Sequence, residues 1–122
     1  MSDASNSLPD QLPGIDVAFG LKQCSGNPDL LLSLLQNFRE DYSDAGPRLR
    51  STDTTSSKSE LLHDMRGAAI NLGITTLGDR CRELREHLKH SELLTDEQLQ
   101  RFQVELEKIG SSIKTLDSFH QR

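Results

Sequence analysis

The stretch LLHDMRGAAINLG, residues 61–73, decides how the rest of this chain is interpreted. A helix turns about 100° per residue, so residues three or four apart share a face. One face of this helix gathers the apolar residues Leu61, Leu62, Met65, Ala68, Ala69 and Leu72. The other face carries His63, Arg66, Gly67 and Ile70. We therefore expect a helix that buries the first face and presents a histidine, a cation and a glycine to solvent.

The sequence before this stretch predicts two helices. Asp16 is a suitable N-cap for a short helix that ends near Ser25–Gly26. Asn27–Pro28 then starts a longer helix, because proline suits a first helical turn, and this helix runs to about Ala45. Gly46–Pro47 ends or kinks it, with one further turn after the break.

Polar connections separate the remaining helices. A hydroxyl-rich segment at residues 51–57 leads into the central helix, which we expect over residues 55–72. Gly73 is placed to take the left-handed conformation that often follows a helix. The next helix starts at Thr75 or Thr76 and ends before a short turn. Its apolar stripe is Leu77, Cys81, Leu84 and Leu88.

The last helix has a clear start. Thr95 and Gln98 match a capping box, in which each side chain bonds the backbone N–H of the other residue. Apolar residues keep helical spacing from there to about Phe119. Short links between amphipathic helices favour antiparallel neighbours. The predicted fold is therefore all-α, an up-and-down antiparallel four-helix bundle with a short additional N-terminal helix. Because β-branched residues do not cluster, we expect no sheet.

Length and composition fit one small domain. The chain has 122 residues, of which 34% are hydrophobic and 27% charged. Residues 1–13 are rich in Ser, Asp and Pro and have no periodic apolar face. We expect a flexible tail or interdomain linker there, and the folded domain over residues 14–122.

Charge and hydropathy argue against several classes of protein. The net charge of −5 and the lack of a basic run argue against nucleic acid as a partner. No apolar run approaches the roughly 20 residues of a membrane span, and no signal-peptide pattern is visible. Cys24 and Cys81 have no metal-ligand spacing, so we expect free thiols and no metal site. We expect a cytoplasmic monomer.

The surroundings of His63 distinguish it from an ordinary surface histidine. We interpret the other histidines as solvated surface residues: His87, His90 and His120. Arg66 lies about one turn from His63 and can donate charge-assisted hydrogen bonds to phosphate oxygens on its imidazole. Gly67 costs a helix interior about 1 kcal/mol relative to Ala, which the close approach of a partner would explain. Ile70 extends the same exposed face.

The chemistry of this face suits a carrier of a phosphoryl group. Free histidine titrates at about pH 6.5, so its neutral imidazole offers a nucleophilic nitrogen at neutral pH. The sequence contains neither a GxxxxGK[ST] loop nor a GxGxxG motif for a nucleotide, and no carboxylate cluster suited to Mg²⁺. A partner would have to bring the metal and the acidic acceptor that phosphoryl transfer requires.

The pattern H-x-x-R-G-x-x-x-N-L-G at residues 63–73, followed by L-x-x-x-C-x-x-L at residues 77–84, resembles a known family. It looks like the histidine-containing phosphotransfer (HPt) domain of multistep two-component phosphorelays. The lead-in LPGID at residues 12–16 is similar to that of HPt modules attached to bacterial hybrid sensor histidine kinases. The resemblance covers the chain from about residue 12.

The resemblance implies a role for each residue of the exposed face. His63 takes the place of the phosphorylated histidine, the acceptor and donor of the phosphoryl group. Gly67 takes the place of the small residue that lets a receiver domain approach. Arg66 stands where Lys is commoner and keeps a positive charge beside the phosphate, and Ile70 belongs to the docking face.

The resemblance also implies a function without catalysis of its own. His63 would accept a phosphoryl group from an aspartate on one receiver domain and pass it to an aspartate on another. The partners would be the receiver domains of a hybrid sensor kinase and of a response regulator, with Mg²⁺ supplied by the receiver domain. No other cofactor, nucleic acid or direct membrane contact is expected. The chain could be free-standing or the cytoplasmic end of a membrane-bound kinase.

Two other interpretations are compatible with the residues. A small helical adaptor could bind signalling partners through the same face without transferring a phosphoryl group. A cofactor-binding bundle could use His63 as a ligand, but it would need His63 and a second ligand to face the interior.

Overall fold

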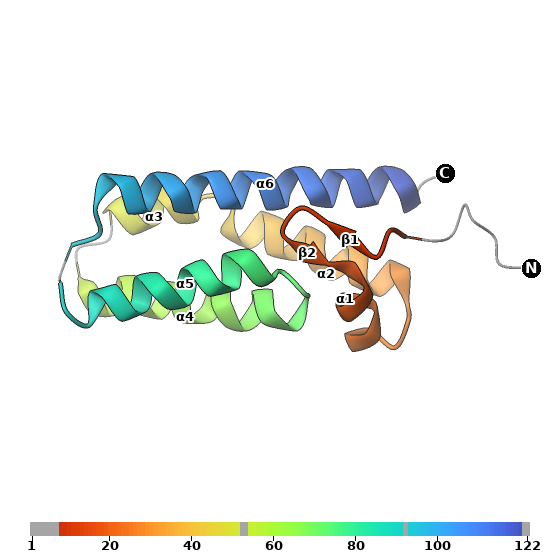
Figure 1. Cartoon of the computed structure of the whole chain (residues 1–122), viewed down its shortest axis with the longest axis horizontal. Coiled ribbons are helices and arrows are strands. Elements are labelled where there is room, and N and C mark those ends of the chain that lie inside the picture. The colour runs from red at the N-terminus through yellow and green to blue at the C-terminus, as the bar shows by residue number, and fades with distance from the viewer. Residues whose placement is uncertain (1–7, 52–53, 92, 121–122) are drawn as a thin grey trace, which may run out of the picture.

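The computed structural model describes residues 8–51, 54–91 and 93–120, with the side chain of residue 120 left out. This part of the chain is mostly helical and has one short two-stranded ribbon (Figure 1). The elements are β1 (Gln11–Leu12), β2 (Ile15–Asp16), α1 (Val17–Gln23), α2 (Pro28–Tyr42), α3 (Ala45–Ser51), α4 (Thr55–Asn71), α5 (Thr75–Leu88) and α6 (Asp96–His120).

The long helices pack around one apolar core. Helices α4 and α5 lie side by side and make the most extensive contact between elements, while α6 runs along α2, α3 and α5 (Figure 1). The apolar face predicted for α4 is buried, apart from the half-buried Ala68. The largest fully buried side chains are Phe102, Ile15, Leu31, Leu35, Leu49, Leu62, Met65, Ile74, Leu77, Ile109, Ile113 and Leu116.

The turn between α4 and α5 has the predicted left-handed glycine. Gly73 has φ +81°, and the Ile74 N–H donates to the Ala69 carbonyl at 2.8 Å, which closes the end of α4. Helix α5 then begins at Thr75, one of the two expected positions. The Asp16 N–H donates to the Gly73 carbonyl at 2.7 Å, so the turn also holds the N-terminal part of the domain.

The N-terminal ribbon corrects two expectations, a flexible tail through residue 13 and the absence of a sheet. Residues 1–7 of that tail lie outside the described residues, but Gln11–Leu12 pairs antiparallel with Ile15–Asp16. Pro13 and Gly14, the latter at φ +82°, occupy the centre of the turn, which suits this residue pair. The Ser112 hydroxyl on α6 donates to the Pro13 carbonyl at 2.7 Å, so the ribbon is joined to the helices.

The break between α2 and α3 falls earlier than Gly46–Pro47, where the sequence predicts it. Helix α2 ends at Tyr42, and Pro47 lies in the first turn of α3. Proline has no N–H to donate, and its ring would clash with the carbonyl four residues earlier, at Ser43. The chain therefore breaks one turn before the proline, and the new helix starts with the bond from the Arg48 N–H to the Asp44 carbonyl.

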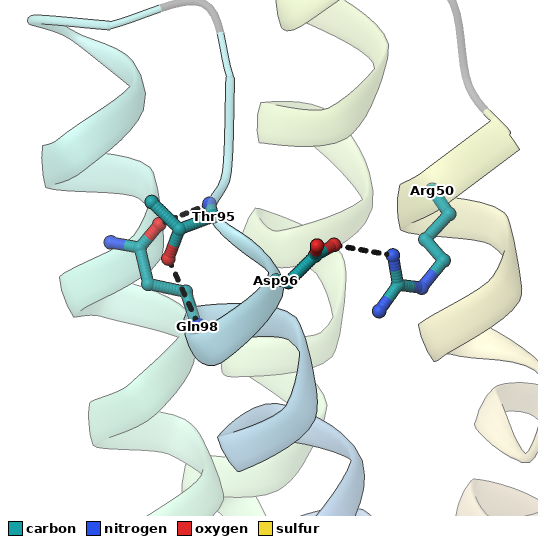
Figure 2. Close-up of polar contacts among 4 residues, drawn as sticks. All are labelled: Arg50, Thr95, Asp96 and Gln98. Carbon is teal, nitrogen blue, oxygen red and sulfur yellow. Dashed lines mark hydrogen bonds and ion pairs between the residues drawn. The ribbon is translucent and has the colours of Figure 1, made fainter.

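The start of α6 confirms the predicted capping box. The Gln98 N–H donates to Thr95 Oγ1 at 3.1 Å, and the Thr95 N–H donates to Gln98 Oε1 at 2.8 Å (Figure 2). Beside it, Arg50 at the end of α3 pairs with Asp96 at 2.9 Å (Figure 2). Both partners are exposed, so the pair orients the two helix ends and contributes little stability.

Replacing Gly73 tests how much the domain depends on its turn. A Cβ at Gly73 would press on the Asp16 carbonyl, whereas a Cβ at Gly26, also left-handed at φ +77°, would meet nothing within 4 Å. We expect Gly26→Ala to lower the free energy of unfolding by about 1 kcal/mol, the cost of the conformation alone. Gly73→Ala should lower it by about 3 kcal/mol or more.

Urea unfolding followed by circular dichroism measures both variants against the unmodified chain. Equal losses in the two variants would show that the contact between residues 16 and 73 carries no stability of its own.

Candidate functional site

Helix α4 brings the four predicted site residues onto one open face. His63 and Gly67 are exposed, Ile70 is 41% exposed, and Arg66 is half-buried. A Cβ at Gly67 would meet nothing within 4 Å, so a partner could approach the backbone here without moving a side chain. His63 faces solvent, which contradicts the interpretation of His63 as an interior cofactor ligand.

Two contacts give the register in which α5 packs against α4. A Cβ at Gly78 would lie 3.5 Å from Ile70 Cγ1, and Arg85 Nε donates to Ser59 Oγ at 3.4 Å. Because the helices run in opposite directions, positions between these contacts pair in reverse order. Arg66 therefore lies level with Cys81 on α5.

Arg66 is held against α5 without a hydrogen-bond acceptor. Its Nε is buried and has no partner among the described residues. An unpaired buried donor of this kind typically costs about 1–3 kcal/mol. The guanidinium is thus a cation close to His63 with unused donor capacity.

The thiol that lies level with Arg66 is chemically unreactive. Cys81 is fully buried, and burial raises the pKa of its thiol to about 12, with Arg66 acting in the opposite direction. Since the thiolate is the reactive form of cysteine, Cys81 is not a nucleophile at neutral pH. Both Cys24 and Cys81 are buried free cysteines, as expected from the sequence.

Two further arginines on α5, which the sequence reasoning missed, extend the positive charge along this side of α4. Arg85 reaches Ser59, which precedes His63 by about one helical turn. Arg82 is exposed and shares the α5 face of Gly78 and Arg85, because the three are three or four residues apart. Arg66, Arg82 and Arg85 form what we call the basic edge, in which the exposed Glu86 offsets part of the charge of Arg82. In the sequence, these arginines are visible only as charged residues that flank the apolar stripe of α5. The register between α4 and α5 is needed to place them beside His63.

The opposite side of the open face is acidic. Helical spacing places the exposed Glu60 and Asp64 across His63 from Arg66, and we call this pair the acidic edge. Asp64 lies on the α2 side, because burial and then the Asp64 carboxylate raise the pKa of Tyr42 on α2. His63 therefore stands between edges of opposite charge, and the basic edge is the side that would attract an anion.

The remaining histidines have other surroundings. His90 is exposed, as expected. The half-buried His87 corrects its interpretation as a solvated residue, because its Nε2–H donates to the Leu93 carbonyl at 2.9 Å and so holds the α5–α6 connection. The side chain of His120 lies outside the described residues.

The pockets and the metal-binding side chains of the described residues do not indicate a second binding site on the open face of α4. The groove between α2 and α6, of about 310 Å³, lies on other helices and has Phe38, Leu106 and Ile113 among its lining residues. Among the described residues, no three His, Cys, Asp or Glu side chains come together to hold a metal ion. No helix in the same ranges has the length and apolar content to cross a membrane.

Comparisons with protein-family models, curated proteins and solved structures find no match for this chain. The open face of α4 is therefore the feature that bears on its function.

Replacing Gly67 tests whether the fold needs a glycine at this position. Because a Cβ there enters open space, we expect Gly67→Ala to raise the free energy of unfolding by up to about 1 kcal/mol, the difference in helix propensity. Urea unfolding measures it. A loss of stability would mean that the glycine serves the fold itself, since the substitution adds only one methyl group.

The raised pKa of the Cys81 thiol implies that the stability of the fold decreases at alkaline pH. The unfolded chain releases the Cys81 proton near the ordinary value of 9.0, whereas the folded chain keeps it up to about 12. The unfolded state is therefore favoured as pH rises through this window, by about 1.4 kcal/mol per unit for this one group. In Cys81→Ala the free energy of unfolding, measured with urea, should therefore fall less steeply between pH 9 and 11 than in the unmodified chain. Parallel declines in the two proteins would contradict this account of the thiol.

Proposed function

We propose that this chain is a phosphorelay intermediate of the histidine-containing phosphotransfer type. His63 accepts a phosphoryl group from an aspartate on one receiver domain and donates it to an aspartate on another. The observation that carries the proposal is the open face of α4, where an exposed imidazole lies beside a cation and a glycine with free space above it.

The proposed architecture is an up-and-down antiparallel four-helix bundle. In it α2 and α3 act as one bent helix, followed by α4, α5 and α6, with α1 as the additional short helix. The contacts of α4 with α2, α3 and α5, and of α6 with α2, α3 and α5, support this arrangement. Such a bundle leaves the outer face of each helix free for a partner.

The transfer step needs little from the chain beyond a positioned nucleophile and a cation. The imidazole nitrogen that bears the lone pair attacks phosphorus, and the other ring nitrogen keeps its hydrogen. The N–P bond forms as the P–O bond to the aspartate breaks, and the bonding electrons return to the carboxylate oxygen. Arg66 donates to the phosphoryl oxygens, whose charge must be neutralised during the transfer.

The partner completes the site in this proposal. The receiver domain brings the aspartate and Mg²⁺, and the chain contributes no cofactor, nucleotide site or kinase activity of its own. Gly67 and Ile70 form the centre of the docking face. We propose a monomer that works on the cytoplasmic side, where receiver domains are found.

Phosphoryl transfer to His63 tests the proposal directly. The purified chain is first treated with phosphoramidate, a small donor of phosphoryl groups to histidine, and the modified residue is identified by mass spectrometry. The phosphorylated chain is then mixed with Mg²⁺ and each receiver domain of the source genome. We expect rapid transfer to a small subset of these domains, and none from His63→Gln.

His90→Gln is the matched control for this experiment, because His90 is another exposed histidine and should not be needed. If no receiver domain accepts the phosphoryl group, or if His63→Gln transfers as well as the unmodified chain, the phosphorelay proposal is wrong. Binding of receiver domains without transfer would instead favour an adaptor.

Bulk at Gly67 should separate docking from chemistry. Gly67→Arg adds a long side chain over the open face and none to the core, so we expect an intact helical fold and at least about a tenfold slower transfer to receiver domains. Labelling of His63 by phosphoramidate should persist, because that donor is small. Equal loss of both reactions would show that the substitution damages His63 itself rather than docking.

A further inference from the structure

Arg66 combines two properties that matter for the open face. It is the cation of the open face, yet its Nε–H is buried against α5 without an acceptor among the described residues. A charged donor in this position would gain from any good acceptor within reach. Its present position is therefore a weakly held one.

The residue of α5 that lies level with Arg66 offers it little in exchange. The register set by the contacts between Ile70 and Gly78 and between Ser59 and Arg85 places Cys81 level with Arg66. The Cys81 side chain is fully buried. A thiol sulfur is a poor hydrogen-bond acceptor, so Cys81 does not bind the guanidinium strongly.

We propose that Cys81 leaves Arg66 free to turn to an anion on His63, because position 81 offers the guanidinium no strong acceptor. The inference rests on the proposed function for the identity of that anion, a phosphoryl group. The sulfur offers the guanidinium no competing bond. When the phosphoryl group arrives, Arg66 gains the acceptor that it lacks in the unphosphorylated chain.

Two substitutions of nearly equal size separate this role from simple packing. Cys81→Ser places a hydroxyl oxygen under Arg66, and this oxygen can accept from Nε–H and hold the guanidinium on α5. Cys81→Ala removes the sulfur and offers no acceptor, so Arg66 stays free. Both leave a small cavity, so loss of packing alone would affect them alike.

The first measurement follows Arg66 itself and does not depend on phosphoryl transfer. In ¹⁵N-labelled protein, the Arg66 Nε–H signal is assigned by its loss in Arg66→Lys. We expect this proton to exchange with water about tenfold more slowly in Cys81→Ser, as a charge-assisted bond would cause. Its exchange in Cys81→Ala should stay close to that of the unmodified chain.

The second measurement follows transfer from phosphorylated His63 to the receiver domain found by profiling. We expect Cys81→Ser to be slower by about tenfold, approaching Arg66→Ala, while Cys81→Ala stays near the original rate. Urea unfolding shows that both position-81 variants are folded at the assay temperature.

The outcomes separate this inference from the proposed function. Equal slowing of transfer in Cys81→Ser and Cys81→Ala, or an unchanged exchange rate of the Arg66 Nε–H in Cys81→Ser, overturns the inference about Cys81. If no variant transfers a phosphoryl group, the proposed function fails. The exchange measurement then decides alone whether Cys81 leaves Arg66 unbound.

Discussion

The fold is organised around the left-handed turn at Gly73. This turn reverses the chain within three residues, so that α5 packs back along α4, and its carbonyl receives the Asp16 N–H. The same reversal sets the register that places Cys81 beside Arg66 and Arg85 beside Ser59. One backbone conformation thus joins the N-terminal ribbon, the helix pair and the surroundings of His63.

Local signals in the sequence were sufficient for most of the helices. Gly73 marks a helix end through its own conformational freedom, and Thr95 with Gln98 marks a start through reciprocal bonds to the backbone. The short ribbon at Pro13–Gly14 was missed, because two-residue strands have no measurable alternation and gain stability from contacts such as that with Ser112. Pairing and packing across the chain, rather than local preference, decide such elements.

In the candidate site, too, some features follow from the sequence and others depend on the packing of the helices. The positions of His63, Arg66, Gly67 and Ile70 on one face follow from helical spacing alone, and the structure places them there. Within the described part of the chain, the lack of an acceptor for the Arg66 Nε–H and the presence of Arg82 and Arg85 nearby depend on how α5 packs. A periodic pattern indicates which residues share a helix face, but not which neighbour stands next to that face.

The opposite charges of the basic edge and the acidic edge affect how any protein approaches and binds α4. A basic edge and an acidic edge on either side of His63 make a dipole that lies across the helix. A partner whose surface carries the complementary charges experiences a torque before contact. This torque favours the orientation in which opposite charges face each other over the one rotated by half a turn. The range of this steering is about 8 Å at physiological ionic strength, so the surface selects an orientation during the last step of approach.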